Sequence, residues 1–270
     1  IPLLWRLAPD GRASDPLPLI GHTDRVNLLA FSPDSHYLAT AGVDGTARLW
    51  DLRAGDPAAA PRVLAGHQEE VLSLAFSPDS SRMITGSFDT TARLWNLQSA
   101  DPSADSIVLT GHTDQITAVA VSADGRWAVT ASRDSTVRLW DLHSPNPALS
   151  PIVLHGHEGA VRAVLFSADN RWLVTAGNDN AARLWGLYQP ETEAIPAYLY
   201  GHTRSVRHMS FTPDGCWLAT GSVDGTVRLW PLQANAPGAA PIVLPSHDTA
   251  LYALDISADG RWLATGGQAT

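Results

Sequence analysis

The sequence repeats itself at a fixed interval of 45 residues. Six histidines follow this interval along the whole chain: His22, His67, His112, His157, His202 and His247. Tryptophans that close a recurring Arg-Leu-Trp phrase keep the same spacing, at Trp50, Trp95, Trp140, Trp185 and Trp230. Internal repetition of this length indicates an architecture in which every copy forms one structural unit and packs on its neighbours.

The last copy lacks its ending, and the first residues of the chain supply it. The next tryptophan of the series would fall five residues beyond Thr270, and Trp5 stands in phase with it because the 270 residues make six intervals of 45. We therefore expect a closed ring whose last unit is completed by strands from both termini, which would also cover two exposed strand edges. A fragment of a longer array is the alternative, and the phase match disfavours it.

Each repeat has the pattern of short strands joined by tight turns. In the first copy, residues 26–32, 37–43 and 46–52 are rich in β-branched, aromatic and other apolar residues, and a shorter strand is expected within residues 61–67. The connections carry Ser-Pro-Asp-Ser and Val-Asp-Gly, which are hairpin sequences. The sequence therefore predicts an all-β chain.

These features resemble the WD40 family of β-propellers. The resemblance rests on a Gly-His pair, a Ser-Pro-Asp turn, a Leu-Ala-Thr strand and an Arg-Leu-Trp-Asp strand at fixed spacing, and it covers essentially the whole chain. It implies an all-β, six-bladed WD40-type β-propeller with four antiparallel strands per blade, its last blade closed by N- and C-terminal strands. Seven blades is the family's commonest number, so six is a departure. We expect residues 1–270 to be a single domain, excised from a longer protein because the chain opens with Ile1.

A histidine, a hydroxyl, a carboxylate and a tryptophan recur in every complete repeat. The resemblance implies that they form a structural network in which Asp orients His, His meets the hydroxyl, and the hydroxyl meets the Trp N–H. The complete sets are His22, Thr40, Asp44, Trp50; His67, Thr85, Asp89, Trp95; His112, Thr130, Asp134, Trp140; His157, Thr175, Asp179, Trp185; and His202, Thr220, Asp224, Trp230. The sixth copy has His247, Thr265 and Trp5 but Ala269 in place of the aspartate. A catalytic role is disfavoured because an enzyme needs one such site, not five.

Composition excludes several classes of function. The net charge of −9 argues against nucleic acid or an anionic membrane as the partner. The single cysteine, Cys216, excludes an internal disulfide and favours a reducing, cytoplasmic compartment. The four histidines outside the repeat positions lack metal-ligand spacing, and no Gly-rich phosphate loop is present. We expect no metal, no cofactor and no enzymatic activity.

Function is expected at positions that vary between the repeats. Three positions per repeat should point to the face that carries the Gly-His loops: two flank the opening apolar residue of the first strand, and one precedes the network aspartate. In chain order they are Arg25, Asn27, Val43; Glu70, Leu72, Phe88; Gln115, Thr117, Arg133; Ala160, Arg162, Asn178; Ser205, Arg207, Val223; and Ala250, Tyr252, Gln268. The candidate partner-binding residues, chosen because arginine and large apolar side chains dominate binding hot spots, are Arg25, Leu72, Phe88, Arg133, Arg162, Arg207 and Tyr252. A solvated face without a partner is the alternative.

Two hypotheses of function remain. The favoured one is a non-enzymatic, monomeric module that binds a protein or peptide, such as an acidic segment, or other domains of its own longer chain. Arrays similar to this one, by the family resemblance, belong to larger bacterial signalling or defence proteins. The alternative is a propeller hydrolase with a substrate site at the channel mouth. That enzyme would need an acid, base or metal cluster that occurs once, and the sequence shows none.

Overall fold

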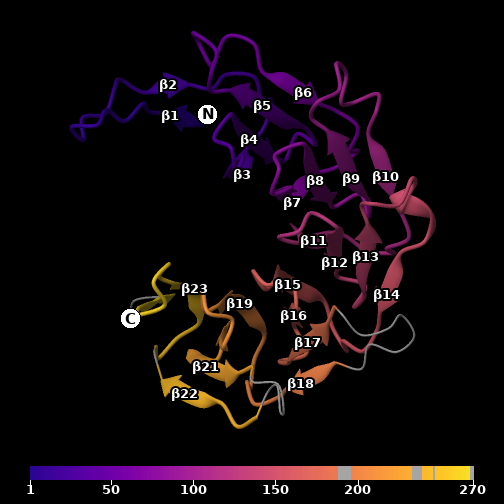
Figure 1. The fold of residues 1–270 in the computed structure, drawn as a ribbon, viewed down its shortest axis with the longest axis vertical. Helices are drawn as coiled ribbons and strands as arrows, with labels where there is room; N and C mark the ends of the chain where they lie inside the picture. The colour runs from indigo at the N-terminus through magenta and orange to yellow at the C-terminus, as the bar shows by residue number, and fades with distance from the viewer. Residues whose placement is uncertain (188–195, 233–238, 246, 268–270) are drawn as a thin grey trace.

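The computed structural model describes residues 1–187, 196–232, 239–245 and 247–267 of the chain. Within these residues the regular structure consists of strands β1 to β24 and one 3-10 turn, η1 (Pro147–Leu149). Figure 1 shows the sheets standing side by side around an arc, with the first strand of each sheet toward the centre and the last at the outside. The expected all-β propeller arrangement is confirmed.

Five four-stranded antiparallel sheets, called blades 1 to 5, take their strands in chain order from the centre outward. Blade 1 contains β3 (Val26–Phe31), β4 (Tyr37–Gly42), β5 (Ala47–Asp51) and β6 (Arg62–Leu64). Blade 2 contains β7 (Val71–Phe76), β8 (Arg82–Ser87), β9 (Ala92–Asn96) and β10 (Ile107–Leu109). Blade 3 contains β11 (Ile116–Val121), β12 (Trp127–Ser132), β13 (Val137–Asp141) and β14 (Ile152–Leu154). Blade 4 contains β15 (Val161–Phe166), β16 (Trp172–Gly177), β17 (Ala182–Gly186) and β18 (Ala197–Leu199). Blade 5 contains β19 (Val206–Phe211), β20 (Trp217–Ser222), β21 (Thr226–Pro231) and β22 (Ile242–Pro245).

The turn between the first two strands of a blade is held by its own side chains. In blade 1, the Ser32 hydroxyl donates to Asp34 Oδ1 at 2.6 Å and accepts the Tyr37 N–H at 2.8 Å. Ser35 has a φ of 57°, and Gly125, which holds the same place in blade 3, has a φ of 71°. Because this left-handed conformation suits glycine, asparagine and small polar residues, the Ser-Pro-Asp-Ser phrase and its variants fix the hairpin locally.

Neighbouring blades share their apolar cores. Leu49 and Leu64 of blade 1 belong to the same buried cluster as Met83 and Trp95 of blade 2, and equivalent clusters join the later blades. Trp95 is fully buried there. Each blade is thus stabilised mainly by the apolar surface that it buries against the next blade.

The two ends of the chain form the two halves of the sixth blade. β1 (Leu3–Leu4) pairs with β2 (Leu17–Pro18), and β23 (Leu251–Ile256) pairs with β24 (Leu263–Gly267). Leu4 and Leu19 pack on Leu38 and Trp50 of blade 1, as Leu49 and Leu64 pack on blade 2. Leu251 of β23 is buried against blade 5. Each half therefore lies against the blade that it is expected to cover.

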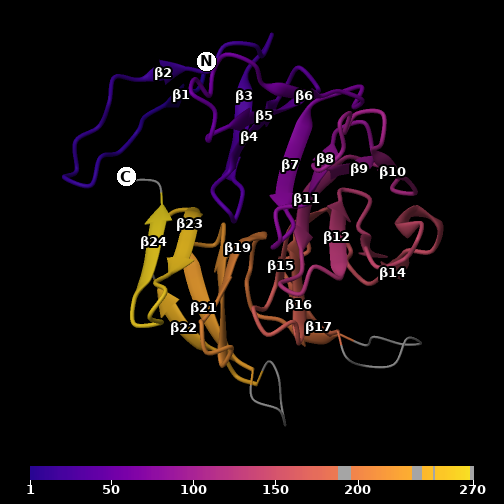
Figure 2. The same ribbon diagram turned by 45° about the horizontal axis from the view of Figure 1, so that its top comes forward.

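The two halves of the sixth blade are not paired with each other among the described residues, and both views leave β23 and β24 apart from β1 and β2 (Figures 1 and 2). As a result, Leu29 and Phe31 of blade 1 are 63% and 60% exposed, whereas their counterparts Leu74 and Phe76 pack on blade 1. The other blades join their inner and outer strands through a covalent turn. The two ends have no such link, so their pairing carries an entropic cost that the other blades avoid. The six-bladed plan is confirmed, and the expected strand pairing across its last blade is absent from this structure.

Deletion of residues 1–20 is expected to lower the melting temperature sharply, because Leu38 and Trp50 would lose the side chains that cover them. The single change Leu19→Ala should lower the free energy of unfolding by about 2–4 kcal/mol, as for other buried leucines. Leu3, which is 46% exposed, supplies the control, and Leu3→Ala should cost less than about 1 kcal/mol. Thermal and denaturant unfolding measure both, and an unchanged melting temperature after the deletion would contradict the packing described here.

Candidate functional site

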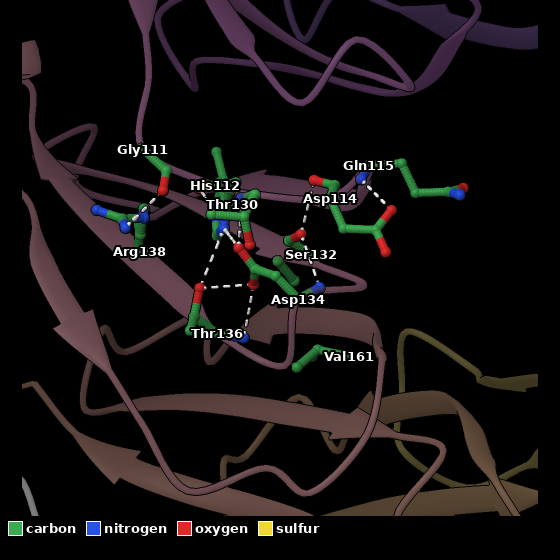
Figure 3. A network of polar contacts seen from close by, with 12 residues as sticks. Gly111, His112, Asp114, Gln115, Thr130, Ser132, Asp134, Thr136, Arg138 and Val161 are labelled. Carbon is green, nitrogen blue, oxygen red and sulfur yellow. Dashed lines mark hydrogen bonds and ion pairs between the residues drawn. The ribbon is translucent and has the colours of Figure 1, made fainter.

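A buried polar network ties the Gly-His loop of each complete blade to the blade's second and third strands. In blade 3 the imidazole of His112 donates from Nδ1 to Asp134 Oδ2 at 2.9 Å (Figure 3). Trp140 Nε1 donates to Thr130 Oγ1 at 3.0 Å, and the Thr130 hydroxyl lies 2.9 Å from His112 Nε2. Because the ionised Asp134 carboxylate can only accept, the neutral imidazole of His112 carries its proton on Nδ1, and Nε2 accepts the proton of the Thr130 hydroxyl.

The same contacts recur in all five complete blades. His to Asp, His to Thr and Trp to Thr distances all lie between 2.8 and 3.0 Å. The sets are His22, Thr40, Asp44, Trp50; His67, Thr85, Asp89, Trp95; His112, Thr130, Asp134, Trp140; His157, Thr175, Asp179, Trp185; and His202, Thr220, Asp224, Trp230. Every threonine and tryptophan of these sets is buried, so the network acts inside the blades and offers no hydroxyl to a substrate.

A second hydroxyl completes the network in four blades, and the sequence analysis missed it. Thr46, Thr91, Thr136 and Thr226 donate to the second carboxylate oxygen of the network aspartate at 2.7–2.8 Å. Blade 4 has Ala181 at this place, and Asp179 Oδ1 is buried there without a partner among the described residues. Arg183 compensates by donating to Asp179 Oδ2 at 2.6 Å. The 45-residue recurrence of these threonines was the signal that could have found them.

The sixth network is partial. His247 Nε2 lies 3.1 Å from Thr265 Oγ1, as in the other repeats. Trp5 is 48% exposed on the other half of the blade and donates no bond to Thr265 among the described contacts. Ala269, the expected substitute for the aspartate, lies outside the described residues. The structure therefore brings together two of the three residues expected for this set.

Burial and hydrogen bonding set the charges of the network. Burial lowers the pKa of His67, His112, His157 and His202 below the usual value, although the partner aspartate opposes the shift. Burial would raise the pKa of Asp224, but the bonds from Thr226 and the Thr203 N–H outweigh it and lower this pKa to about 2. Near neutral pH, these four histidines are therefore neutral imidazoles, and the aspartates that they contact are ionised.

A β-bulge at the start of each inner strand directs the variable positions. The register shifts after the first residue of β3, β7, β11, β15, β19 and β23, so one residue per strand is left without a partner across the ladder. These residues are Asn27, Leu72, Thr117, Arg162, Arg207 and Tyr252. A bulge changes the direction of the side chain of its extra residue. The six extra residues therefore hold equivalent positions on the same face of their blades.

Backbone bonds bring the other two variable positions of a blade together beside the bulge. The Phe88 N–H donates to Glu70 O at 2.9 Å, and the Arg133 N–H donates to Gln115 O at 3.0 Å. The same bond joins Val43 to Arg25, Asn178 to Ala160, and Val223 to Ser205. Gln268 of the sixth repeat lies outside the described residues. The three positions expected from the sequence thus share one face in each of the five complete blades.

Three arginines on neighbouring blades lie within electrostatic reach of one another on this face. Burial lowers the pKa of Arg162, and the charges of Arg207 and Arg133 lower it further, while Asp114 opposes them. None of the three guanidinium groups forms an ion pair among the described residues. Only Arg162 has a side-chain bond, from Nε to Asn178 Oδ1 at 3.3 Å. We call Arg133, Arg162 and Arg207 the arginine arc.

The remaining candidate residues border the arc differently. Tyr252 is 54% exposed and lines one cavity with Arg162 and Arg207. Phe88 is 46% exposed, whereas Leu72 is half-buried. Arg25 is exposed on blade 1, two blades from Arg133. The structure therefore joins Tyr252 to the arc directly, and it shows no contact of Leu72, Phe88 or Arg25 with the arc among the described residues.

A family model described as WD domain, G-beta repeat matches the chain six times, over residues 16–51, 60–96, 105–141, 150–186, 195–231 and 240–269. The chain belongs to the WD40 repeat family. WD40 repeats generally build propeller scaffolds for protein–protein interaction. A comparison with curated proteins gave no match.

A group of metal-ligating side chains or a long apolar helix in this WD40 chain would indicate another kind of function. Within the described ranges, no three His, Cys, Asp or Glu side chains are grouped so that they could hold a metal ion. That part of the chain also contains no helix with the length and apolar character of a membrane span.

Asp134→Ala is expected to lower the free energy of unfolding by about 1–3 kcal/mol, because the buried His112 and Thr136 lose their acceptor. Glu158→Ala removes the same charge from an exposed side chain, and it should change stability by less than about 0.5 kcal/mol. Urea unfolding of both variants measures the difference. Equal stability of Asp134→Ala and the unmodified protein would show that the network contributes nothing.

The propeller should lose stability as the pH falls below about 6.5. The unfolded chain takes up protons on its histidines there, whereas His67, His112, His157 and His202 resist protonation because their pKa values are lowered in the folded state. A second loss is expected below about pH 4, where the network aspartates, whose pKa values are also lowered, must take up protons on unfolding. Melting temperatures recorded between pH 8 and pH 3 test this, and a flat profile would contradict it.

Proposed function

We propose that this WD40 propeller is a non-enzymatic interaction module that binds an acidic protein or peptide segment on the face of the arginine arc. The observation that carries the proposal is the placement of Arg133 and Arg207 on the blades either side of Arg162, with no ion pair to any of the three guanidinium groups among the described residues, although the charge of Asp114 also acts on Arg162. An anionic segment would remove the repulsion among these groups. The protein as a whole carries a charge of −9, so the arc is a local exception to its surface.

Apolar side chains beside the arc supply the second component of a binding surface. Tyr252 stands at one end, next to Arg207, with its ring more than half exposed. Phe88 is exposed at the corresponding edge of blade 2, the blade adjacent to Arg133. Large rings and arginines are the residue types that most often carry binding energy. We infer that charge attraction speeds the encounter of the two proteins. Burial of an apolar side chain of the partner then prolongs the lifetime of the complex.

The repetition of the polar network supports a non-enzymatic role. Five equivalent His, Asp and Thr sets lie inside the blades, where the threonine hydroxyl already serves the histidine and the tryptophan. A hydrolase would need one set that differs from the others and opens to a substrate. Blade 4 does differ, since Ala181 replaces the second threonine, but Arg183, which has an equivalent arginine in every complete blade, is 3% exposed and already bonded to Asp179 and to the Gly156 carbonyl.

The cellular setting is part of the same proposal. A free, exposed thiol at Cys216 suits a reducing compartment, so we place the protein in the cytoplasm. The acidic net charge supports a partner that is neither nucleic acid nor an anionic membrane. We propose a monomeric propeller that serves a larger bacterial signalling or defence protein, with either a separate acidic partner or another domain of the same chain on its arginine arc.

The triple variant Arg133→Ser, Arg162→Ser, Arg207→Ser tests the proposal. The probe is a synthetic peptide rich in glutamate with one tryptophan, and its affinity for the variant should fall at least about tenfold, because three positive charges leave the face. Affinity for the unmodified protein should also fall as salt rises, because the charges on this face are screened. The melting temperature should be unchanged, since none of the three residues belongs to the polar network.

A matched control separates the arc from net charge. The triple variant Arg12→Ser, Arg53→Ser, Arg261→Ser removes three exposed positive charges outside the arginine arc and should keep the affinity for the peptide. If the arc variant binds the peptide as well as the control does, the binding surface lies elsewhere, and the Pro- and Ala-rich loops of the opposite face become the next candidates.

A further inference from the structure

A cavity of about 410 Å³ lies at the end of the arginine arc. Its walls are Arg162, Arg207, His208 and Tyr252, which come from three neighbouring inner strands, β15, β19 and β23. Arg162, Arg207 and Tyr252 are the extra residues of three consecutive bulges, so the same backbone device turns all three side chains to this place. Two guanidinium groups, one imidazole and one phenol therefore converge on one space.

The charge of the cavity is not balanced within the described protein. Arg162 is half-buried and Arg207 is exposed, and neither forms an ion pair in the part of the chain described here. The Arg162 pKa is lowered by burial and then by the neighbouring Arg207 and Arg133, and Asp114 is the acidic group that acts on it in the other direction. Burial and Arg207 also lower the pKa of His208, so the imidazole stays neutral and keeps one N–H to donate.

We propose that this cavity is a binding site for a phosphate monoester, an inference that rests on the proposed function and specifies the anion that the arginine arc selects. A phosphate monoester carries a charge of about −1.5 to −2 at pH 7 and presents three acceptor oxygens. Its charge matches the two guanidinium groups, and its oxygens can accept from Arg162, Arg207 and the donors of His208 and Tyr252. Guanidinium groups also match phosphate geometry with two parallel hydrogen bonds.

A carboxylate satisfies this cavity less well. It carries one charge, so one of the two guanidinium groups would remain uncompensated, and the repulsion between them would be only partly relieved. It presents two oxygens to four side chains that can donate. The geometry therefore favours the dianion, and the selectivity between phosphate and carboxylate is the property that distinguishes this inference from the binding of any acidic segment.

The experiment is a nuclear magnetic resonance titration of the isotope-labelled propeller, with the Arg162 and Arg207 Nε–H signals and the Tyr252 amide as reporters. The probes are the tripeptides Ala-phosphoserine-Ala, Ala-Glu-Ala and Ala-Ser-Ala, together with phenyl phosphate and inorganic phosphate. Ala-phosphoserine-Ala should bind at least about tenfold more tightly than Ala-Glu-Ala, because the dianion offers an additional charge and oxygen to the arginines. Comparison with phenyl phosphate and inorganic phosphate shows whether the ester comes from a protein side chain or from a small molecule.

Three variants test whether the residues of the cavity are responsible for the phosphate selectivity. The double variant Arg162→Ser, Arg207→Ser should lose the phosphate selectivity, whereas Arg261→Ser, an exposed arginine at the opposite end of the inner half of the sixth blade, should retain it. Asp114→Asn removes the acidic group that faces Arg162 and should tighten binding of the phosphotripeptide by about twofold to fivefold. Loss of selectivity in Arg261→Ser, or unchanged selectivity in the double variant, would overturn the assignment of the site.

The outcomes separate this inference from the proposed function. If Ala-Glu-Ala shifts the reporter signals with the same affinity as Ala-phosphoserine-Ala, the phosphate site is wrong while the acidic-segment function stands. If neither tripeptide nor either free phosphate moves the Arg162 and Arg207 signals, the arc binds no anion and both proposals fall. If the phosphate probes bind and the glutamate-rich peptide does not, the phosphate site is supported and the binding of an acidic segment is contradicted.

Discussion

A buried imidazole needs a partner at each ring nitrogen, and the architecture of the five complete blades depends on how that need is met. The Gly-His loop contributes the histidine, the second strand the threonine, and the turn before the third strand the aspartate, so a single histidine such as His112 links three segments through Thr130 and Asp134. The tryptophan that donates to the threonine is also a core residue between two blades. Polar satisfaction and apolar packing therefore hold the same residues in place.

This arrangement separates the residues that hold the blade from the residues that distinguish one blade from another. The network fills the body of the blade with nearly the same atoms five times, while the bulge at the start of each inner strand carries in turn Asn27, Leu72, Thr117, Arg162 and Arg207. A change from Thr117 to Arg162 between blades 3 and 4 alters the face and leaves the blade's core unaffected. Some bulge side chains bond within the propeller, as Thr117 Oγ1 does to Ala131 O at 3.2 Å. Others, such as Arg207 and Tyr252, form no side-chain hydrogen bond among the described residues.

Most of the fold followed from the sequence because every signal pointed the same way. The interval of 45 residues, the hairpin sequences and the strand composition agreed, and the five complete blades have the expected four strands. The sixth blade shows the limit of this reasoning. The 45-residue spacing assigned Trp5 to the last repeat. That spacing contains no information on the entropic cost of pairing two chain ends that no turn connects.

The site followed from the sequence only in part. Placement of the variable positions on one face could be derived, because they hold equivalent places in a repeating backbone. The break in the threonine series at Ala181 is visible in the sequence, but the bond from Arg183 to Asp179 is not, because it depends on where a long side chain goes when Asp179 Oδ1 is left unsatisfied. The cavity lined by His208 and the lowered pKa of this histidine were not predicted either. Neither the burial of a side chain nor the approach of side chains from different strands can be read from a single sequence.

The arrangement of the arginines on consecutive blades matters more than their number. Charges at a protein surface are screened beyond about 8 Å in physiological salt, so three arginines scattered around the ring would act as three separate weak sites. On blades 3, 4 and 5 two of them act on the third: burial lowers the pKa of Arg162 most, and the charges of Arg207 and Arg133 lower it further. Repulsion of that kind raises the free energy of the unliganded face, and an anion that binds there relieves it. If the proposed acidic partner binds, the arginine arc would direct it to one sector of one face, because the net charge of the protein as a whole is negative.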